Sequence, residues 1–360
     1  MIRLFRATDF RCLENAELSL SSNFNLIYGA NASGKTSLLE ALAYLGRGKS
    51  FRGASTTNLI RHGREEFVLF GQVDGLARTR SLGVRNSRAG LEVRIDGDNE
   101  GGAAALAEAL PLQVIDPEVH NLVAGGPEQR RRFLDWVAFH VEQDHLLAWR
   151  RFRRALKQRN AALRAKSGPA TIHSWNAEFV ALSGELDESR RQALGVALDS
   201  LAEFGRDLLG TELGFEYQQG WGKGRELGEV LQEGLERDLQ MGATQHGPHR
   251  ADLKISYDEK QAKKLVSRGQ QKLLASAMIL AATETAQTAL ERPLLLLLDD
   301  PAAELDAESL ERLMAAVARL GCQVVATSLE PGLPGTPPGA ALFHVEHGVF
   351  TVVPAPENGP

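Results

Sequence analysis

The N-terminal third of the chain alternates apolar and polar residues at the spacing of half-buried strands. Residues 2–8 and 16–20 follow this two-residue period, and so do residues 67–73, 76–84 and 91–95. An Asp-Gly pair and a stretch rich in Gly, Asn and Ser separate the last three runs. Short alternating runs joined by turn residues predict an antiparallel β layer.

The pattern changes to a helical period after Pro117. Apolar residues recur three and four positions apart from Phe133 to His140, and again from Trp149 to Leu163. The helical character continues to about Leu239, without a heptad repeat long enough for an extended coiled coil. We therefore predict a mostly helical lobe over residues 117–244.

Sheet character returns in the last third of the chain. Short apolar runs alternate there with helical patterns, and this alternation is typical of a parallel sheet covered by helices. We predict an α/β protein whose sheet domain is split into residues 1–116 and 245–360 around the inserted lobe. The elements predicted in the last third are strands at 252–255, 294–298 and 323–326, helices from about Gln270 and over 308–320, and a hairpin over 341–352.

Composition is that of a globular protein, with 43% hydrophobic and 24% charged residues. The N-terminus is charged at once, so we expect no signal peptide. The longest apolar stretches, near residues 294–298 and 278–282, are too short to span a bilayer, so we expect no membrane partner. Two cysteines exclude a disulfide framework and fit a reducing, cytoplasmic location.

Charge is distributed unevenly along the chain. Residues 130–166 contain eleven Lys/Arg and three Asp/Glu, a local excess of +8, whereas the net charge is -5, so the remainder is about -13. A basic block in an acidic protein indicates an anionic partner, either nucleic acid or a membrane surface.

Residues 29–36 fit the G-x-x-x-x-G-K-[ST] pattern of a phosphate-binding loop. A strand-like run precedes them and a helix-like run follows, which directs backbone N–H groups and a helix N-terminus toward a phosphate. Lys35 would reach the β- and γ-phosphates, and Thr36 would hold Mg²⁺. An ordinary glycine-rich turn is the alternative, and it does not require both flanks. The predicted nucleotide-binding residues are Gly29, Ala30, Asn31, Ala32, Ser33, Gly34, Lys35 and Thr36.

A second acidic segment supports a nucleoside triphosphate site. Residues 294–298 are all leucine and are followed by Asp299 and Asp300, as at the carboxyl end of a buried parallel strand. Asp299 would act on Mg²⁺ through water and Asp300 would polarise the attacking water. Two capping acids are the alternative, but a complete phosphate loop favours catalysis. We therefore predict Lys35, Asp299 and Asp300 as catalytic.

A Ser-Arg-Gly-Gln segment stands at a predicted helix start, where free N–H groups can bind an anion. Taken alone, its serine is better interpreted as a helix cap. Residues 265–272 nevertheless resemble the L-S-G-G-Q signature of the ABC-type ATPase superfamily, and residues 303–306 resemble its D-loop. The resemblance implies a head-to-tail homodimer with two ATP molecules at its interface. The residues so assigned are Ser267, Arg268, Gly269, Gln270 and Asp306.

Longer segments resemble the RecF family of recombination mediators, from the first strand to the terminal hairpin. They include Asp9-Phe10-Arg11, residues 117–135 and the run from His246 to Leu253. The resemblance implies an ABC-type P-loop ATPase head with an adjoining antiparallel β layer and an inserted helical lobe. It implies ATP and Mg²⁺ as cofactors, an ATP-dependent homodimer, and weak DNA-stimulated ATP hydrolysis. It further implies binding to duplex and duplex–single-strand junctions in recombinational repair and replication restart, where RecA recombinase is loaded with the mediator proteins RecR and RecO.

The basic block suits this function, because DNA binding without sequence preference requires Lys and Arg side chains that contact phosphates. On a helix over residues 149–163 the apolar side chains can face the core while the basic ones lie elsewhere. A solvated face with internal ion pairs is the alternative for any one arginine. The predicted DNA contacts are Arg130, Arg131, Arg150, Arg153, Arg154 and Lys157.

Departures from the superfamily pattern predict slow turnover. Typical ABC transporters carry Glu where Asp300 stands and a switch His where this chain has Ala326-Thr327-Ser328. A hydroxyl cannot replace imidazole in relaying charge. Gln113 is a further candidate Mg²⁺ contact.

Three rival functions remain to be weighed against this prediction. The ATP-binding subunit of a membrane transporter would lack a basic helical insertion of this length. A P-loop phosphotransferase would not need the signature and D-loop. A structural-maintenance-type head would need coiled-coil arms.

Overall fold

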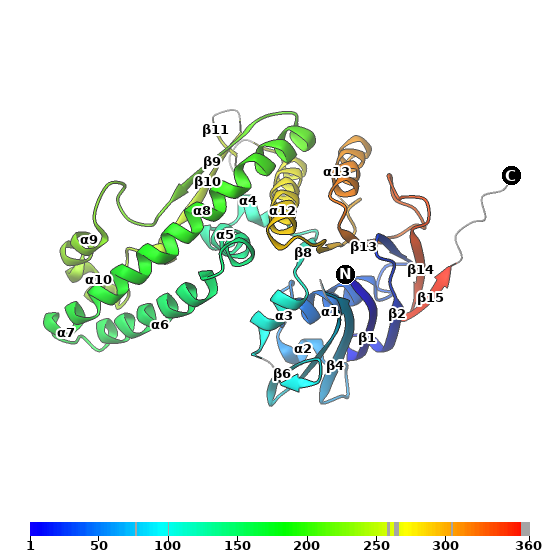
Figure 1. The fold of residues 1–360 in the computed structure, drawn as a ribbon, viewed down its shortest axis with the longest axis horizontal. Coiled ribbons are helices and arrows are strands. Elements are labelled where there is room, and N and C mark those ends of the chain that lie inside the picture. Colours follow the sequence, from blue (N-terminus) through cyan, green and yellow to red (C-terminus); the bar gives the residue numbers. More distant parts are fainter. Residues whose placement is uncertain (76–77, 100, 258–259, 263–265, 304, 354–360) are drawn as a thin grey trace. The chain divides into compact units, whose positions relative to one another are not determined.

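A computed structural model describes residues 1–353 except 76–77, 100, 258–259, 263–265 and 304. The chain forms two compact units. We call residues 1–119 with 291–360 the sheet unit, and residues 120–290 the helical unit (Figure 1).

One sheet of the sheet unit is antiparallel, in the order β2-β1-β4-β5-β6-β7. Its strands bury every second side chain, so that Phe5, Phe67 and Leu82 pack in one core with Leu38 and Leu42 of helix α1. This arrangement confirms the predicted antiparallel layer. The elements are β1 Ile2–Phe10, β2 Leu13–Ser19, β4 Glu66–Asp74, β5 Thr79–Ser87, β6 Gly90–Ile95, β7 Asp98–Asn99, α1 Lys35–Arg47, α2 Thr56–Leu59 and α3 Ala103–Ala109. The first two residues of the strand predicted at 76–84 lie outside the described residues.

The second sheet of this unit has the order β15-β14-β3-β13-β12-β8. All of its strands are parallel except β15, which runs antiparallel to β14. Strands β12 and β13 are buried throughout, which explains their continuous apolar sequence. The elements are β3 Phe24–Tyr28, β8 Leu112–Ile115, β12 Leu295–Leu298, α13 Ala307–Arg319, β13 Gln323–Ser328, β14 Ala341–Glu346 and β15 Val349–Val353.

The helical unit is built around the long helix α8, with α5, α6 and α12 packed along it (Figure 1). Phe152 and Phe179 lie in its core with Leu182 and Leu186. The elements are α4 Asn121–Ala124, α5 Pro127–Val141, α6 His145–Arg164, α7 Pro169–Ser174, α8 Asn176–Leu209, β9 Leu213–Gln218, α9 Leu227–Glu233, α10 Leu235–Met241, η1 Pro248–Arg250, β10 Asp252–Tyr257, β11 Lys260–Gln261 and α12 Arg268–Leu290.

The boundary between the units differs from the predicted division at its C-terminal side. Residues 245–290, expected with the sheet domain, belong to the helical unit because α12 packs on α8 and α5, and β10 pairs with β9. Within the described residues, α12 is also the one helix whose length and hydropathy would allow it to cross a membrane. Two thirds of that helix window is buried inside the protein, as in a core helix.

Candidate nucleotide-binding site

The phosphate loop connects β3 to α1 in the sheet unit. Gly34, the residue before the helix, has a φ of 118°, which strains any residue other than glycine. The Lys35 ammonium turns back over the loop and donates to the carbonyl oxygens of Gly29 (2.6 Å) and Ala30 (2.8 Å). Ser33 Oγ is buried, and no described group hydrogen-bonds to it. A cation and an unsatisfied hydroxyl in one loop suit a phosphate ligand.

Three oxygen-bearing side chains converge beside this loop, at the carboxyl edge of the parallel sheet. Thr36 Oγ1 and Thr327 Oγ1 each donate to Asp299 Oδ1 at 3.0 Å. The Asp300 backbone N–H donates to Thr327 Oγ1 at 2.9 Å. Hydroxyl and carboxylate oxygens are ligands that Mg²⁺ accepts, so Thr36 and Asp299 are fitted to hold it.

Thr327 is a site residue that the sequence prediction missed. Its strand, β13, lies between β3 and β12 in the sheet, so the end of β13 separates the phosphate loop from the acidic strand end. The sequence had marked this position only for lacking a histidine. The structure shows that its buried hydroxyl orients the Asp299 carboxylate and the following backbone.

The Asp299 carboxyl is buried, and burial raises its pKa because the charged form loses hydration. Hydrogen bonds from Thr36 and Thr327 oppose this rise, and so does the positive charge of Arg52. Arg52 lies outside both predicted motifs, so the sequence did not identify it as part of this site.

A second carboxyl lies near Asp299. Asp116 follows β8, whose last residue accepts a hydrogen bond from the Asp299 backbone at 2.9 Å. Burial, and then the charge of Asp299, raise the pKa of Asp116 to about 6. Burial lowers the pKa of Lys35, although Asp300 and Asp299 favour its charged form. Acids and a lysine that interact electrostatically in one site suit a phosphate bound with a divalent cation.

Two predicted residues have distinctive positions. Asp300 is half-buried and has a φ of 48°, an uncommon left-handed conformation for a residue other than glycine. Gln113 lies within β8 opposite Leu296, and its side-chain oxygen accepts a hydrogen bond from Arg47 at 3.1 Å. Gln113 is 5% exposed, and its contact with Mg²⁺ stays a prediction.

The signature segment begins α12 in the helical unit. The Ser267 backbone N–H donates to Gln270 Oε1 at 3.0 Å, and the Gln270 N–H donates to Ser267 Oγ at 3.3 Å. This reciprocal capping box satisfies two helix-end donors, as the helix-cap interpretation predicts. Ser267, Arg268 and Gln270 are exposed and Gly269 is half-buried, whereas Leu265 lies outside the described residues.

The D-loop segment precedes α13. Asp306 caps this helix by accepting hydrogen bonds from the Ser309 backbone (2.8 Å) and hydroxyl (3.0 Å). These bonds lower the pKa of Asp306. Glu304 of the same segment lies outside the described residues.

Two of the six predicted DNA contacts have intramolecular partners. Arg130 is 8% exposed and forms a two-pronged ion pair with Asp252, at 2.7 and 3.1 Å. Arg131 donates to the Ala251 carbonyl at 2.7 Å. Arg130 therefore holds the first residue of β10 and has little surface left for a phosphate, whereas Arg131 is half-buried and stays a predicted contact.

The other four predicted contacts are exposed on α6. Arg150, Arg153, Arg154 and Lys157 form no ion pair with any described residue. The Arg153 guanidinium lies over the Trp149 ring, 5.0 Å from its centroid. Because the apolar residues of α6 face the core, the free cations share the outer side of the helix.

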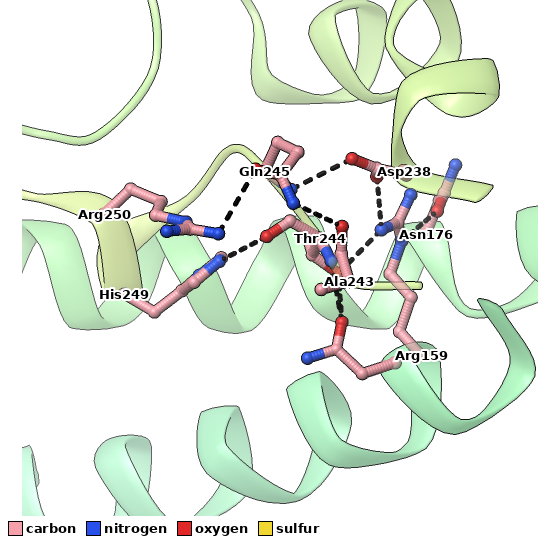
Figure 2. A network of polar contacts seen from close by, with 9 residues as sticks. Arg159, Asn176, Asp238, Ala243, Thr244, Gln245, His249 and Arg250 are labelled. Carbon is pink, nitrogen blue, oxygen red and sulfur yellow. Dashed lines mark hydrogen bonds and ion pairs between the residues drawn. The ribbon is translucent and has the colours of Figure 1, made fainter. Parts of the chain in front are cut away.

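Arg159 of the same helix has a different environment. It is fully buried and donates to Asp238 Oδ2 (2.7 Å), Thr244 Oγ1 (2.7 Å) and Asn176 Oδ1 (3.0 Å). Figure 2 shows how these partners connect onward to Gln245 and His249. This buried network joins α6, α8 and α10 to the segment that leads into η1.

A phosphate loop and an acidic strand end separated by one parallel strand define a P-loop nucleoside triphosphatase head. Residues 1–335 match the RecF/RecN/SMC N-terminal domain family. DNA replication and repair protein RecF of Yersinia enterocolitica is 42% identical over 352 residues, covering 96% of this chain and 97% of that protein. RecF of Azotobacter vinelandii is also 42% identical, covering 96% of both chains. The chain belongs to the RecF family of DNA replication and repair proteins.

Solved structures confirm the fold. The recombination mediator protein RecF-ATP in the RecFOR pathway is similar with a TM-score of 0.89 and 23% identity, over 98% of this chain and 97% of that one. An SMC head bound to the C-winged helix domain of ScpA gives a TM-score of 0.61 and 15% identity, over 99% and 98% of the two chains.

Proposed function

We propose that this protein is an ATP-dependent DNA-binding ATPase of recombinational repair and replication restart. The observation that carries the proposal is the convergence of Lys35, Thr36 and Asp299 at one sheet edge, where Thr36 Oγ1 lies 3.0 Å from the carboxylate. A relative studied with ATP has the same fold over nearly the whole chain. A lysine beside a hydroxyl and a carboxylate that can hold Mg²⁺ suits a charged triphosphate better than a neutral ligand.

Hydrolysis follows from the groups at this edge. Bound Mg²⁺ would neutralise phosphate charge, and Thr36 and Asp299 would hold it. Lys35 binds the β- and γ-phosphates once it leaves the loop carbonyls, and Asp300 orients the attacking water. Thr327 keeps Asp299 in place but cannot relay a proton as imidazole does, so we expect slow turnover. Stimulation by DNA is proposed from the family membership. A turnover of hundreds per second would contradict this.

The outer side of α6 is the proposed DNA contact. Its four cations, which form no ion pair with the residues that the structure describes, suit sugar–phosphate backbones, and sequence-independent contacts fit binding to duplex and duplex–single-strand junctions. In this proposal the ATP-bound form is a homodimer that loads RecA recombinase with RecR and RecO. The family membership and the RecFOR pathway of its structural neighbour support these partners.

The decisive experiment is a DNA titration with and without ATP on the wild type and on Lys35→Met. We expect ATP to increase wild-type affinity and to have no effect on the variant. Affinity should fall as salt rises, because phosphate contacts release counterions. ATP-dependent binding by Lys35→Met would refute the mechanism.

The composite site needs a separate test, because Ser267 also caps α12. Ser267→Asp keeps a capping oxygen but adds a negative charge where an anion is expected to bind. We expect this variant to bind ATP and remain monomeric by light scattering, while Ser267→Thr still dimerises. Dimers of Ser267→Asp would rule out a signature facing a partner's ATP.

A further inference from the structure

The turn between β14 and β15 lies against the phosphate loop. It consists of His347 and Gly348, with φ angles of 47° and 79°, the two left-handed residues of a tight hairpin turn. The Gly348 N–H donates to the carbonyl oxygen of Ser33 at 2.8 Å. Strand β14 also pairs directly with β3, the strand that ends at the loop. The C-terminal hairpin therefore borders the loop along β3 and at its turn.

Backbone contacts are close at both ends of the loop. A side chain on Gly34 would meet the Cα of Gly348 at 3.3 Å, and one on Gly29 would collide with the Val345 carbonyl oxygen. A side chain on Gly348 itself would lie 2.9 Å from the Cys12 carbonyl oxygen in the turn between β1 and β2. Gly348 is buried between that turn and the loop. No larger residue fits there without moving backbone.

We propose that Gly348 is a positioning residue of the nucleotide site, and that the C-terminal hairpin holds the phosphate loop in its phosphate-binding conformation. Ser33 and Gly34 precede the lysine, so a shift of the Ser33 carbonyl changes the direction of the N–H groups that follow. The hairpin touches the loop from outside and contributes no group to the phosphate. This inference rests on the proposed ATP binding.

The test compares Gly348→Ala with Gly339→Ala. Both glycines are left-handed, with φ near 80°, so both substitutions carry the same backbone strain. Only Gly348 has a close neighbour, because a side chain on Gly339 meets nothing within 4 Å. By calorimetric titration with Mg-ATP, we expect Gly348→Ala to bind about tenfold more weakly than Gly339→Ala, the effect of one lost hydrogen bond.

A double variant separates positioning from general instability. In a Lys35→Ala background, where the loop has lost its main phosphate contact, adding Gly348→Ala should change affinity by less than it does alone. Equal affinities of Gly348→Ala and Gly339→Ala would overturn the inference and leave ATP binding standing. Failure of the wild type to bind ATP would instead reject the proposed function.

Hydrogen exchange on the wild type gives an independent measurement that needs no glycine variant. If the hairpin favours ATP binding, then ATP binding must stabilise the hairpin, because coupling between two sites is reciprocal. ATP should therefore slow amide exchange over residues 341–353. Lys35→Ala should not show this slowing. Unchanged exchange in the ATP-bound wild type would overturn the inference.

Discussion

Replacing Arg159 with methionine should destabilise the helical unit strongly. The guanidinium is fully buried, and Asp238 beside it is 1% exposed. Without Arg159, the Asp238 carboxylate keeps the hydrogen bond from the Gln245 backbone N–H at 2.9 Å. Removing one member of a buried ion pair leaves an uncompensated charge and costs about 3–5 kcal/mol. Thr244 and Asn176 lose a donor as well.

Urea unfolding followed by tryptophan fluorescence measures this loss, because all four tryptophans (136, 149, 175 and 221) lie in the helical unit. Arg154→Met on the exposed side of α6 is the matched control, and it should change stability by less than about 0.5 kcal/mol. It should weaken DNA binding instead. Replacing Arg159 and Asp238 together with apolar residues should recover part of the loss. A cost below about 1 kcal/mol for Arg159→Met would refute the reasoning.

Two further predictions concern the sheet unit and pH. Thr327→Val should leave the Asp300 N–H unpaired, lower stability by about 1–3 kcal/mol and slow ATP turnover, while Thr327→Ser keeps the hydroxyl and loses less. Calorimetric unfolding and phosphate release measure both, and equal behaviour of the two variants would contradict the role of the hydroxyl. Burial lowers the pKa of His249 and of His145 from 6.5 to about 4. Between pH 4 and 6.5 the unfolded chain therefore binds more protons than the folded protein does. The free energy of unfolding falls as pH drops through this range, and each histidine contributes up to about 1.4 kcal/mol for each pH unit. Urea titrations at pH 7 and 5 should show this loss, and His249→Gln should reduce it; an unreduced loss would show that His249 is not its source.

The phosphate loop and the acidic strand end were predictable from sequence, because each is formed by residues that are close together along the chain. The phosphate loop needs a strand before it and a helix after it, and all three are consecutive along the chain. The leucine run before Asp299 is equally local, since a strand buried on both faces has no polar positions. The order of the strands, which puts Thr327 beside Asp299, required the structure, and so did the approach of Arg52 to the site.

The basic block was harder to interpret because charge alone does not say where a side chain points. Arg130 and Arg154 are both arginines on predicted helices. One is paired with Asp252, more than a hundred positions away, and the other faces solvent. Gln113 likewise has a partner that the sequence did not indicate, since Arg47 comes from α1. Long-range pairing of this kind leaves no periodic signal in the sequence.

The position of β3 in its sheet has a consequence for biosynthesis. This strand leaves the ribosome well before its sheet neighbours β13 and β14. Roughly 300 residues separate β3 from β13, so at about 5–20 residues per second the apolar strand waits some 15–60 s for its partners. The nascent chain must keep it from aggregating during that interval, and ATP cannot assist because the site does not yet exist. Truncation near the C-terminus should therefore abolish nucleotide binding even though the whole phosphate loop has been synthesised.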